Sequence, residues 1–433
     1  MNPVKNTFCC FLLGFPLLCG LSCGKPAGYG NSGEFKRMLW NKDYFRMREA
    51  LAVDSSSLDS LHRQFYRAFV ENAFGDYQGS VSDVLSLLEF HGAELSDSDK
   101  INLLGIQESN YYNTCRYGHA AAADDALLKG FSATLNAQEK KITRNSFTLW
   151  SSLSGVAPQR VEGEGSDTLS WTRDALGLME IPVRCGDSVF QMVFDTRAGM
   201  STLSVSMARS MGLKLLPVSY DLGSGATGLL FKSGLAVADS LQLGHILMRH
   251  VVFQVVSDSL LYFAPVHFGI RGIFGFAAMR ALGQVEIRKA GQMIFSQGEE
   301  GPTPGNLALD GYDPVIRLGV LGDTLNFYFD SGATTSDLYS LFFKRFGRKI
   351  LREGKLKNME LGGAGGVIRQ DLWVLPELKL ICGKKTGLLH QVDIHTSPVT
   401  NEADKFYGNI GQDFISQFNR VTINFKNLYV SVK

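Results

Sequence analysis

The chain has 433 residues, which is enough for two or three domains. Its 43 Lys and Arg residues balance 42 Asp and Glu residues, so no basic surface is predicted and nucleic-acid binding is disfavoured. A hydrophobic fraction of 45%, with 46 glycines against 12 prolines, favours a folded, β-rich protein with many tight turns and excludes a disordered chain.

Residues 1–23 have the composition of an export signal. A lysine precedes the apolar stretch 8–21, which a proline interrupts and which is too short for a stable membrane span. The stretch ends in Gly-Leu-Ser-Cys, which resembles a bacterial lipobox, although Gly20 stands where an aliphatic residue is usual. The resemblance implies lipidation at Cys23. The alternative is a cleavable secretory signal in which Cys23 has no role.

Lipidation would make the chain an exported, membrane-anchored lipoprotein. Residues 24–33, rich in Gly, Pro and Ser, are predicted to be a flexible tether. Because no acidic cluster follows Cys23, a periplasm-facing anchor is expected.

Residues 34–157 are predicted to be helical. Apolar residues recur three and four positions apart in 58–69 and 81–88, and Asp97 and Asp99 suit the first turn of a helix. A weak internal repetition resembles tetratricopeptide repeats, which implies partner proteins on this region. The alternative is a generic helical prodomain or spacer.

The pattern changes to short β runs in the remainder of the chain. Such runs include 189–194 and 325–329. Residues 159–170 and 297–306 are rich in turn-forming residues and are predicted to be linkers. The sequence thus predicts a first β lobe over 172–297 and a second over 307–433.

The two lobes repeat the same three motifs. An apolar strand ends in Phe-Asp-Thr-Arg-Ala-Gly at 194–199 and in Phe-Asp-Ser-Gly-Ala-Thr at 329–334. A Gly-rich segment and then a Gly-x-x-Gly element follow in each lobe, in the same order and at nearly the same spacing. Three ordered matches are unlikely to arise by chance.

This set of motifs resembles the retropepsin and pepsin family of aspartic proteases over about residues 176–433. The resemblance implies an N-terminal helical region followed by two retropepsin-like closed β-barrel lobes. It implies a peptide or protein substrate, no cofactor and no metal. Both copies lie in one chain, so an intramolecular pseudo-dimer is expected, and a homodimer of whole chains is the alternative. The residues that match the family's motifs are the catalytic pair Asp195 and Asp330, the loop-supporting Thr196, Ser331 and Gly332, and the flap glycines Gly223, Gly225, Gly362 and Gly363.

The chemistry requires two carboxyl groups a few ångströms apart. Because both cannot be ionised at once, one keeps a proton while the other acts as general base on a shared water. The expected activity is therefore an aspartic endopeptidase with a water-activating mechanism.

Arg197 departs from the family pattern, since it stands where glycine is expected. Either the loop tolerates this side chain, or the first lobe is degenerate and the protein is a peptide-binding pseudoprotease. A third hypothesis makes the helical region the working module and the β region a scaffold.

Other chemistries find less support. Cys115, Cys185 and Cys382 are too far apart to predict a disulfide framework or a metal site. His245 and His250 lack the i, i+4 spacing of helical zinc ligands, and no Gly-x-Ser-x-Gly motif follows the first Asp loop.

Overall fold

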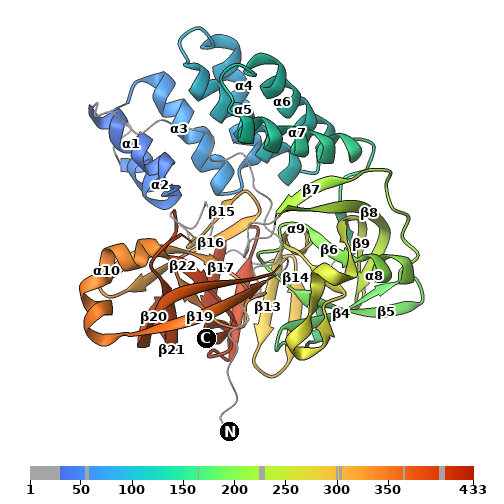
Figure 1. The fold of residues 1–433 in the computed structure, drawn as a ribbon. Helices are drawn as coiled ribbons and strands as arrows, with labels where there is room; N and C mark the ends of the chain where they lie inside the picture. Colours follow the sequence, from blue (N-terminus) through green and yellow to red (C-terminus); the bar gives the residue numbers. More distant parts are fainter. Residues whose placement is uncertain are drawn as a thin grey trace. The chain divides into compact units, whose positions relative to one another are not determined.

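The computed structural model describes residues 30–53, 58–163, 165–223, 230–298, 301, 305–363, 366–398 and 405–433. The described chain divides into two compact units (Figure 1). One unit holds the helices up to Pro158 together with Ala308–Gly311. The other holds Gln159–Leu307 and Tyr312–Lys433, and it contains the β lobes. The predicted fold class, a helical region followed by β-barrel lobes, is confirmed.

The described part of the helical unit contains seven helices. They are α1 (Gly30–Trp40), α2 (Tyr44–Val53), α3 (Ser60–Ala73), α4 (Tyr77–Phe90), α5 (Asp97–Asn113), α6 (Tyr117–Gly130) and α7 (Ala137–Ser152). Several begin where a short polar side chain accepts a backbone N–H of the first turn, as Ser96 does before α5 and Asn136 before α7. Asp310 belongs to the same unit and accepts hydrogen bonds from Lys42 Nζ at 2.8 Å and Tyr44 Oη at 3.1 Å.

The first lobe begins earlier than predicted. Residues 159–170, expected to be a linker, contain β1 (Arg160–Glu162) and β2 (Asp167–Ser170), which pair with strands far along the chain. The other elements of this lobe are β3 (Thr172–Arg173), β4 (Met179–Cys185), β5 (Ser188–Phe194), β6 (Ser201–Ser204), α8 (Val205–Ser210), β7 (Tyr220–Gly223), β8 (Leu230–Leu243), β9 (Ile246–Val256), β10 (Tyr262–Phe263), β11 (Phe268–Gly269), β12 (Gly272–Phe274), α9 (Phe276–Ala281), β13 (Gln284–Arg288) and β14 (Gln292–Ser296).

The second lobe contains a corresponding series of elements. They are β15 (Leu307–Asp310), β16 (Asp313–Val320), β17 (Asp323–Phe329), β18 (Asp337–Leu338), α10 (Ser340–Glu353), β19 (Lys355–Gly363), β20 (Gly366–Cys382), β21 (Lys385–His395), β22 (Gly408–Ile410), α11 (Gln412–Ile415), β23 (Arg420–Asn424) and β24 (Tyr429–Val432).

The two lobes pair their central strands in the same order. In the first lobe β5 runs parallel to β12, β12 runs antiparallel to β6, and β6 runs parallel to β9. In the second lobe β17, β22, β18 and β21 follow the same sequence of pairings. Both arrangements place the loop after a buried strand, β5 or β17, next to a second buried strand.

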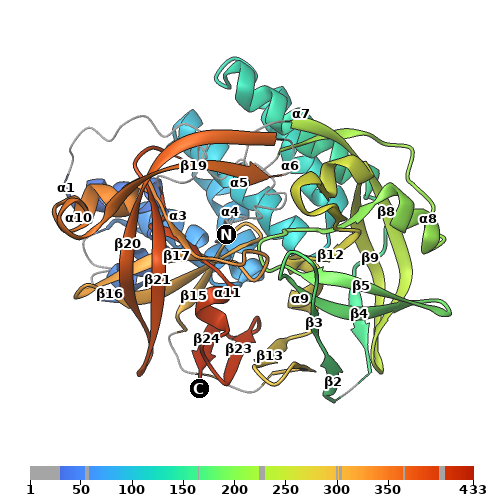
Figure 2. The same cartoon turned by 60° about the horizontal axis from the view of Figure 1, so that its bottom comes forward.

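A five-stranded sheet joins the lobes, in the order β2-β14-β13-β23-β24. Its central pair, β13 from the first lobe and β23 from the second, is antiparallel, and the two strands lie side by side in Figure 2. The ring of Phe276 from the first lobe packs edge-on against that of Phe425 from the second, with centroids 5.5 Å apart. Because each lobe completes the other's sheet, the Asp-bearing loops are held on a shared base.

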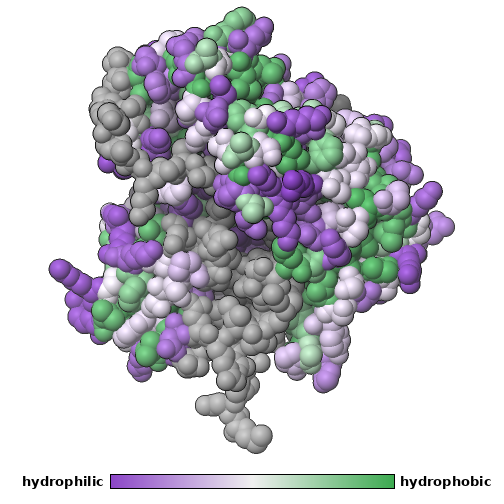
Figure 3. Space-filling model, turned by 45° about the horizontal axis from the view of Figure 1, so that its top comes forward, coloured by the Kyte–Doolittle hydropathy of each residue, from purple (hydrophilic) through white to green (hydrophobic). Residues whose placement is uncertain are grey.

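In the described part of the chain, no helix has the length and hydropathy needed to cross a membrane. Hydrophilic and hydrophobic residues are interspersed over the coloured face in Figure 3.

Candidate active site

Two equivalent loops carry the candidate carboxyl groups. β5 ends in buried Phe194 and β17 in buried Phe329, and an aspartate follows each directly. The backbone N–H of Asp195 donates to Phe274 O at 3.1 Å, and that of Asp330 donates to Ile410 O at 2.9 Å. These bonds fix both loops to the neighbouring strands β12 and β22.

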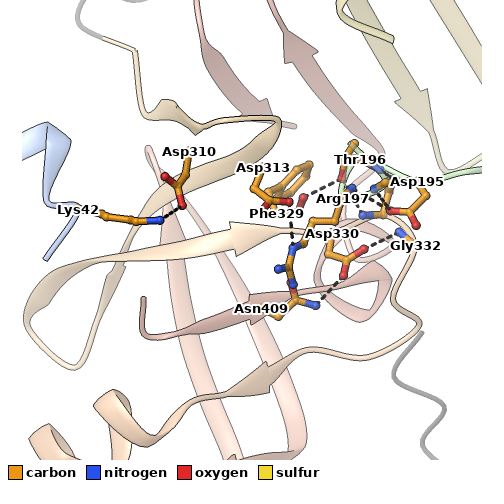
Figure 4. Close-up of polar contacts among 12 residues, drawn as sticks. Lys42, Asp195, Thr196, Arg197, Asp310, Asp313, Phe329, Asp330, Gly332 and Asn409 are labelled. Carbon is orange, nitrogen blue, oxygen red and sulfur yellow. Dashed lines mark hydrogen bonds and ion pairs between the residues drawn. The ribbon is translucent and has the colours of Figure 1, made fainter. Parts of the chain in front are cut away.

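The hydroxyl groups that follow the aspartates bind the two loops to each other. Thr196 Oγ1 donates to Phe329 O at 2.7 Å (Figure 4). Ser331 Oγ donates to Phe194 O at 2.8 Å. Each hydroxyl oxygen also accepts the backbone N–H of the opposite residue: Thr196 N lies 3.0 Å from Ser331 Oγ, and Ser331 N lies 2.9 Å from Thr196 Oγ1. Four reciprocal hydrogen bonds therefore hold the loops of the two lobes together.

The two carboxyl groups are buried but differ in their hydrogen bonds. Asp195 and Asp330 are 0% and 1% exposed. Asp195 Oδ1 accepts the backbone N–H groups of residues 197 and 198, and its Oδ2 has no hydrogen-bond partner among the described residues. Asp330 has partners on both oxygens, since Gly332 N donates to Oδ1 and Asn409 Nδ2 to Oδ2, both at 2.8 Å.

Burial and proximity raise the pKa of both groups. Loss of hydration and the charge of Asp330 hold the pKa of Asp195 well above its usual range. Burial also raises the pKa of Asp330, although the Arg197 charge and the Asn409 and Gly332 hydrogen bonds oppose that rise. The arrangement therefore favours a pair that retains one proton.

Gly332 brings the second loop against the first carboxyl group. A Cβ atom at this position would lie 2.2 Å from Asp195 Cγ and 2.4 Å from Asp195 Oδ2. Only glycine permits this approach without displacing the carboxyl group.

Arg197 directs its side chain into the second lobe. Its Nη1 donates to Asn409 Oδ1 at 3.2 Å and lies 3.5 Å from Tyr339 Oη, and its Nε lies 3.7 Å from Asp313 Oδ1. The guanidinium carbon sits 3.9 Å from the centroid of the Tyr328 ring. The side chain is only 17% exposed, so this departure from the family pattern is part of a packed site.

The predicted flap glycines lie on two hairpins. Gly223 ends β7 and pairs with Leu230 of β8, and Gly362 and Gly363 pair across β19 and β20. Gly225 and the hairpin tips lie outside the described residues, as does the predicted lipidation site Cys23.

Within the described ranges, no group of three or more His, Cys, Asp or Glu residues is arranged so that it could hold a metal ion. His245 instead lies with its Nδ1 3.0 Å from Asp167 Oδ2.

The sequence patterns did not identify Asn409, Asp313 and Tyr339 as neighbours of the site. One signal was visible for Asn409, because the second Gly-x-x-Gly element has Asn at the position where the first has Ile273. The other two lie on elements whose approach to Arg197 depends on packing.

The chain resembles known proteins over part of its length. A family model described as "Aspartyl protease" matches residues 181–276, which run from β4 to the start of α9 and include Asp195 and Thr196. A solved retropepsin-like aspartic protease from Rickettsia conorii is 15% identical over 32% of this chain and 91% of that one, with a TM-score of 0.22. No curated protein matches the chain. The first lobe is thus similar in sequence to aspartyl proteases.

Proposed function

We propose that the chain is an aspartic endopeptidase in which Asp195 and Asp330 form the catalytic pair. The observation that supports this proposal most strongly is the set of reciprocal hydrogen bonds of Thr196 and Ser331, which hold the two Asp loops from the two lobes together. Such clamping serves a site that needs both carboxyl groups at fixed positions. The match of residues 181–276 to an aspartyl protease family supports the same activity.

The substrate would be a peptide held between the lobes. The β7–β8 and β19–β20 hairpins would act as flaps that cover it and exclude water. The two lobes of one chain would then form a single site, as an intramolecular pseudo-dimer. A common origin of the lobes by duplication is supported by their shared order of strand pairing.

The chain would act as an exported lipoprotein anchored through Cys23 and facing the periplasm. The export-like composition of residues 1–23 supports this proposal. Substitution of Cys23 by Ala is expected to move the protein from the membrane fraction to the soluble fraction, and an unchanged distribution would contradict the anchor. Partner proteins would bind the tetratricopeptide-like helices.

The alternative is a peptide-binding pseudoprotease, and Arg197 is the observation that favours it. Its guanidinium lies close enough to Asp330 to oppose protonation of that carboxyl group. If this effect left both carboxyl groups ionised, the proton needed for catalysis would be lost.

Peptide-library cleavage across pH by the soluble chain from Gly24 onward, beside Arg197→Gly, tests the proposal. The expected result is cleavage by the parent that a statine-type inhibitor blocks. Cleavage by Arg197→Gly alone would mean a site disabled by one residue, and binding without cleavage by either protein would favour the pseudoprotease.

A further inference from the structure

Asn409 is a polar side chain in a place where the first lobe has an apolar one. It lies on β22 opposite Tyr328 of β17, and it is 0% exposed. The corresponding position on β12 is Ile273, which lies opposite Val193 of β5. The otherwise matched lobes therefore differ beside their catalytic loops.

The Asn409 amide connects Asp330 to Arg197. Its Nδ2 donates to Asp330 Oδ2 at 2.8 Å, and its Oδ1 accepts from Arg197 Nη1 at 3.2 Å. A guanidinium only donates hydrogen bonds and an ionised carboxylate only accepts them, so one orientation of the amide satisfies both. That orientation is matched to a charged Asp330.

Arg197 is held at the far end of this connection by three groups of the second lobe. The Asp313 carboxylate, the Tyr339 hydroxyl and the Tyr328 ring all contact its guanidinium. Although burial disfavours its charge, these neighbours and Asp330 keep the pKa of Arg197 above its ordinary value. The positive charge therefore stays beside Asp330 throughout the working pH range.

Asp195 has no comparable support. Its Oδ1 accepts two backbone N–H groups, but its Oδ2 has no hydrogen-bond partner in the described structure. A buried carboxylate oxygen without a partner is costly, and protonation removes much of that cost.

We propose that Asn409 and Arg197 make Asp330 the ionised member of the pair, which activates the water, while Asp195 carries the shared proton. Asn409 is then a positioning residue for the general base. This assignment rests on the proposed peptidase function and adds to it which carboxyl group does what.

The assignment gives a balanced sequence of steps. The water oxygen bonds to the scissile carbonyl carbon while Asp330 takes a water proton and Asp195 donates its proton to the carbonyl oxygen. The C–N bond of the resulting diol then breaks. Asp330 gives its proton to the leaving nitrogen, and one diol hydroxyl returns a proton to Asp195.

Other ionisable groups face the same region and enter any pH dependence. Asp337 of β18 raises the pKa of Asp330 and itself lies 3.0 Å from His395 Nε2 of β21. Among the described residues, the ionisable groups linked to the two loops include Asp195, Arg197, Asp313, Tyr328, Asp330, Asp337, Tyr339 and His395, together with Asp393 and Asp413, which interact with Asp337.

Asn409→Leu tests the proposal through the pH profile of kcat/KM on a cleaved peptide. Loss of the bond to the carboxylate is expected to move the acidic limb upward by about one pH unit, which lowers the rate about tenfold below that limb. The loss should fall on kcat and leave KM unchanged, because Asn409 contacts the base and not the peptide. Asn424→Leu is the matched control, since Asn424 is equally buried but lies in the interlobe sheet with Gln284. Asn424→Leu should leave the acidic limb of the pH profile unchanged.

Two further measurements keep the test decisive. Arg197→Gln should also move the acidic limb upward, and it serves if Asn409→Leu does not fold. An NMR titration of the carboxyl ¹³C signals, assigned with Asp195→Asn and Asp330→Asn, measures the difference between the pKa values of the two carboxyl groups without requiring cleavage. The pKa of Asp330 should lie below that of Asp195, and Asn409→Leu should reduce the difference between the two values. Asp195 titrating first, or a difference that Asn409→Leu leaves unchanged, would overturn the assignment. Absence of cleavage with the expected titration would refute only the peptidase function.

Discussion

At the scale of single residues, Gly332 of the second loop lies against the Asp195 carboxyl group. Gly332→Ala would place Cβ 2.2 Å from Asp195 Cγ, so the loop or the carboxyl group must move. Displacement of about 1 Å at a reacting group costs on the order of 100-fold in rate. We therefore expect at least that loss in kcat/KM.

Gly347→Ala is the control for this substitution. Gly347 lies on α10, and apart from its chain neighbours and the backbone of its own helix no atom lies within 4 Å of a Cβ built there. Its kcat/KM should match that of the parent. Full activity in Gly332→Ala would contradict the described approach of the two loops.

Thr196 supplies one of the two hydroxyl groups that hold the Asp loops together. Two substitutions separate the effect of its hydrogen bonds from the effect of its shape. Thr196→Val leaves the buried Phe329 O and Ser331 N without their partner, which is expected to cost about 1–3 kcal/mol in the free energy of unfolding. Thr196→Ser keeps the hydroxyl and should retain most of the stability. Urea unfolding of the two variants measures the difference, and equal stabilities would argue against this role of the hydroxyl.

Sequence motifs were enough to select Asp195, Thr196, Asp330 and Ser331, because each follows an apolar strand in a repeated pattern. The path of the Arg197 side chain was not predictable. Its contacts lie on strands of the other lobe, and no local pattern in the sequence states which strands come together.

At the scale of elements, helices α5, α6 and α7 enclose a pair of carboxyl groups remote from the proposed site. Glu108 and Asp124 are 1% and 0% exposed. Glu108 Oε1 accepts from Trp150 Nε1 at 2.7 Å, whereas neither Asp124 oxygen has a hydrogen-bond partner in the described chain. Burial raises the pKa of Glu108 to about 7, and burial with the Glu108 charge raises that of Asp124 well above its usual range.

These raised values predict that the helical unit loses stability as pH rises. A carboxyl group whose pKa is higher in the folded state stabilises fully below its unfolded value, and this contribution is lost as pH rises through the folded value. The window for Glu108 runs from its ordinary 4.5 to about 7. Hydrogen exchange of α5–α7 in the whole chain should report a loss of about 3 kcal/mol in the free energy of opening across this window.

Asp124→Asn and Asp125→Asn form a matched pair for this prediction. Asp124→Asn removes the contribution of Asp124 and should reduce the pH dependence, while the contribution of Glu108, whose pKa is raised by its own burial, should remain. Asp125 lies on the same helix but is 38% exposed and pairs with Lys129, so its substitution should change little. Protection that does not depend on pH in the parent would rule out the raised pKa values.

Elements that a local sequence pattern marks were predictable, and elements that depend on pairing with distant strands were not. The runs 189–194 and 325–329 lie within β5 and β17, since alternating or apolar patterns mark buried strands locally. β1 and β2 were missed because they are short, turn-rich in composition and stabilised only by pairing with β9 and β14. The predicted start of a helix at Asp97 is confirmed by α5.

At the scale of the whole molecule, the two lobes of the β unit depend on each other. They share the sheet built on β13 and β23, and their loops exchange four hydrogen bonds. The repeated motifs and the family resemblance predicted an intramolecular pseudo-dimer, with a homodimer of whole chains as the alternative. The extent of the shared sheet was not predictable, because it depends on how the lobes pack.

Peptide cleavage by Asp195→Asn, by Asp330→Asn and by an equimolar mixture of the two, beside the parent, tests the central claim most directly. We predict that the parent cleaves and that both variants and their mixture do not, since each chain would hold one incomplete site. Cleavage that survives either substitution would contradict the two-carboxylate mechanism. Activity restored by mixing would show that the site forms between chains and not within one.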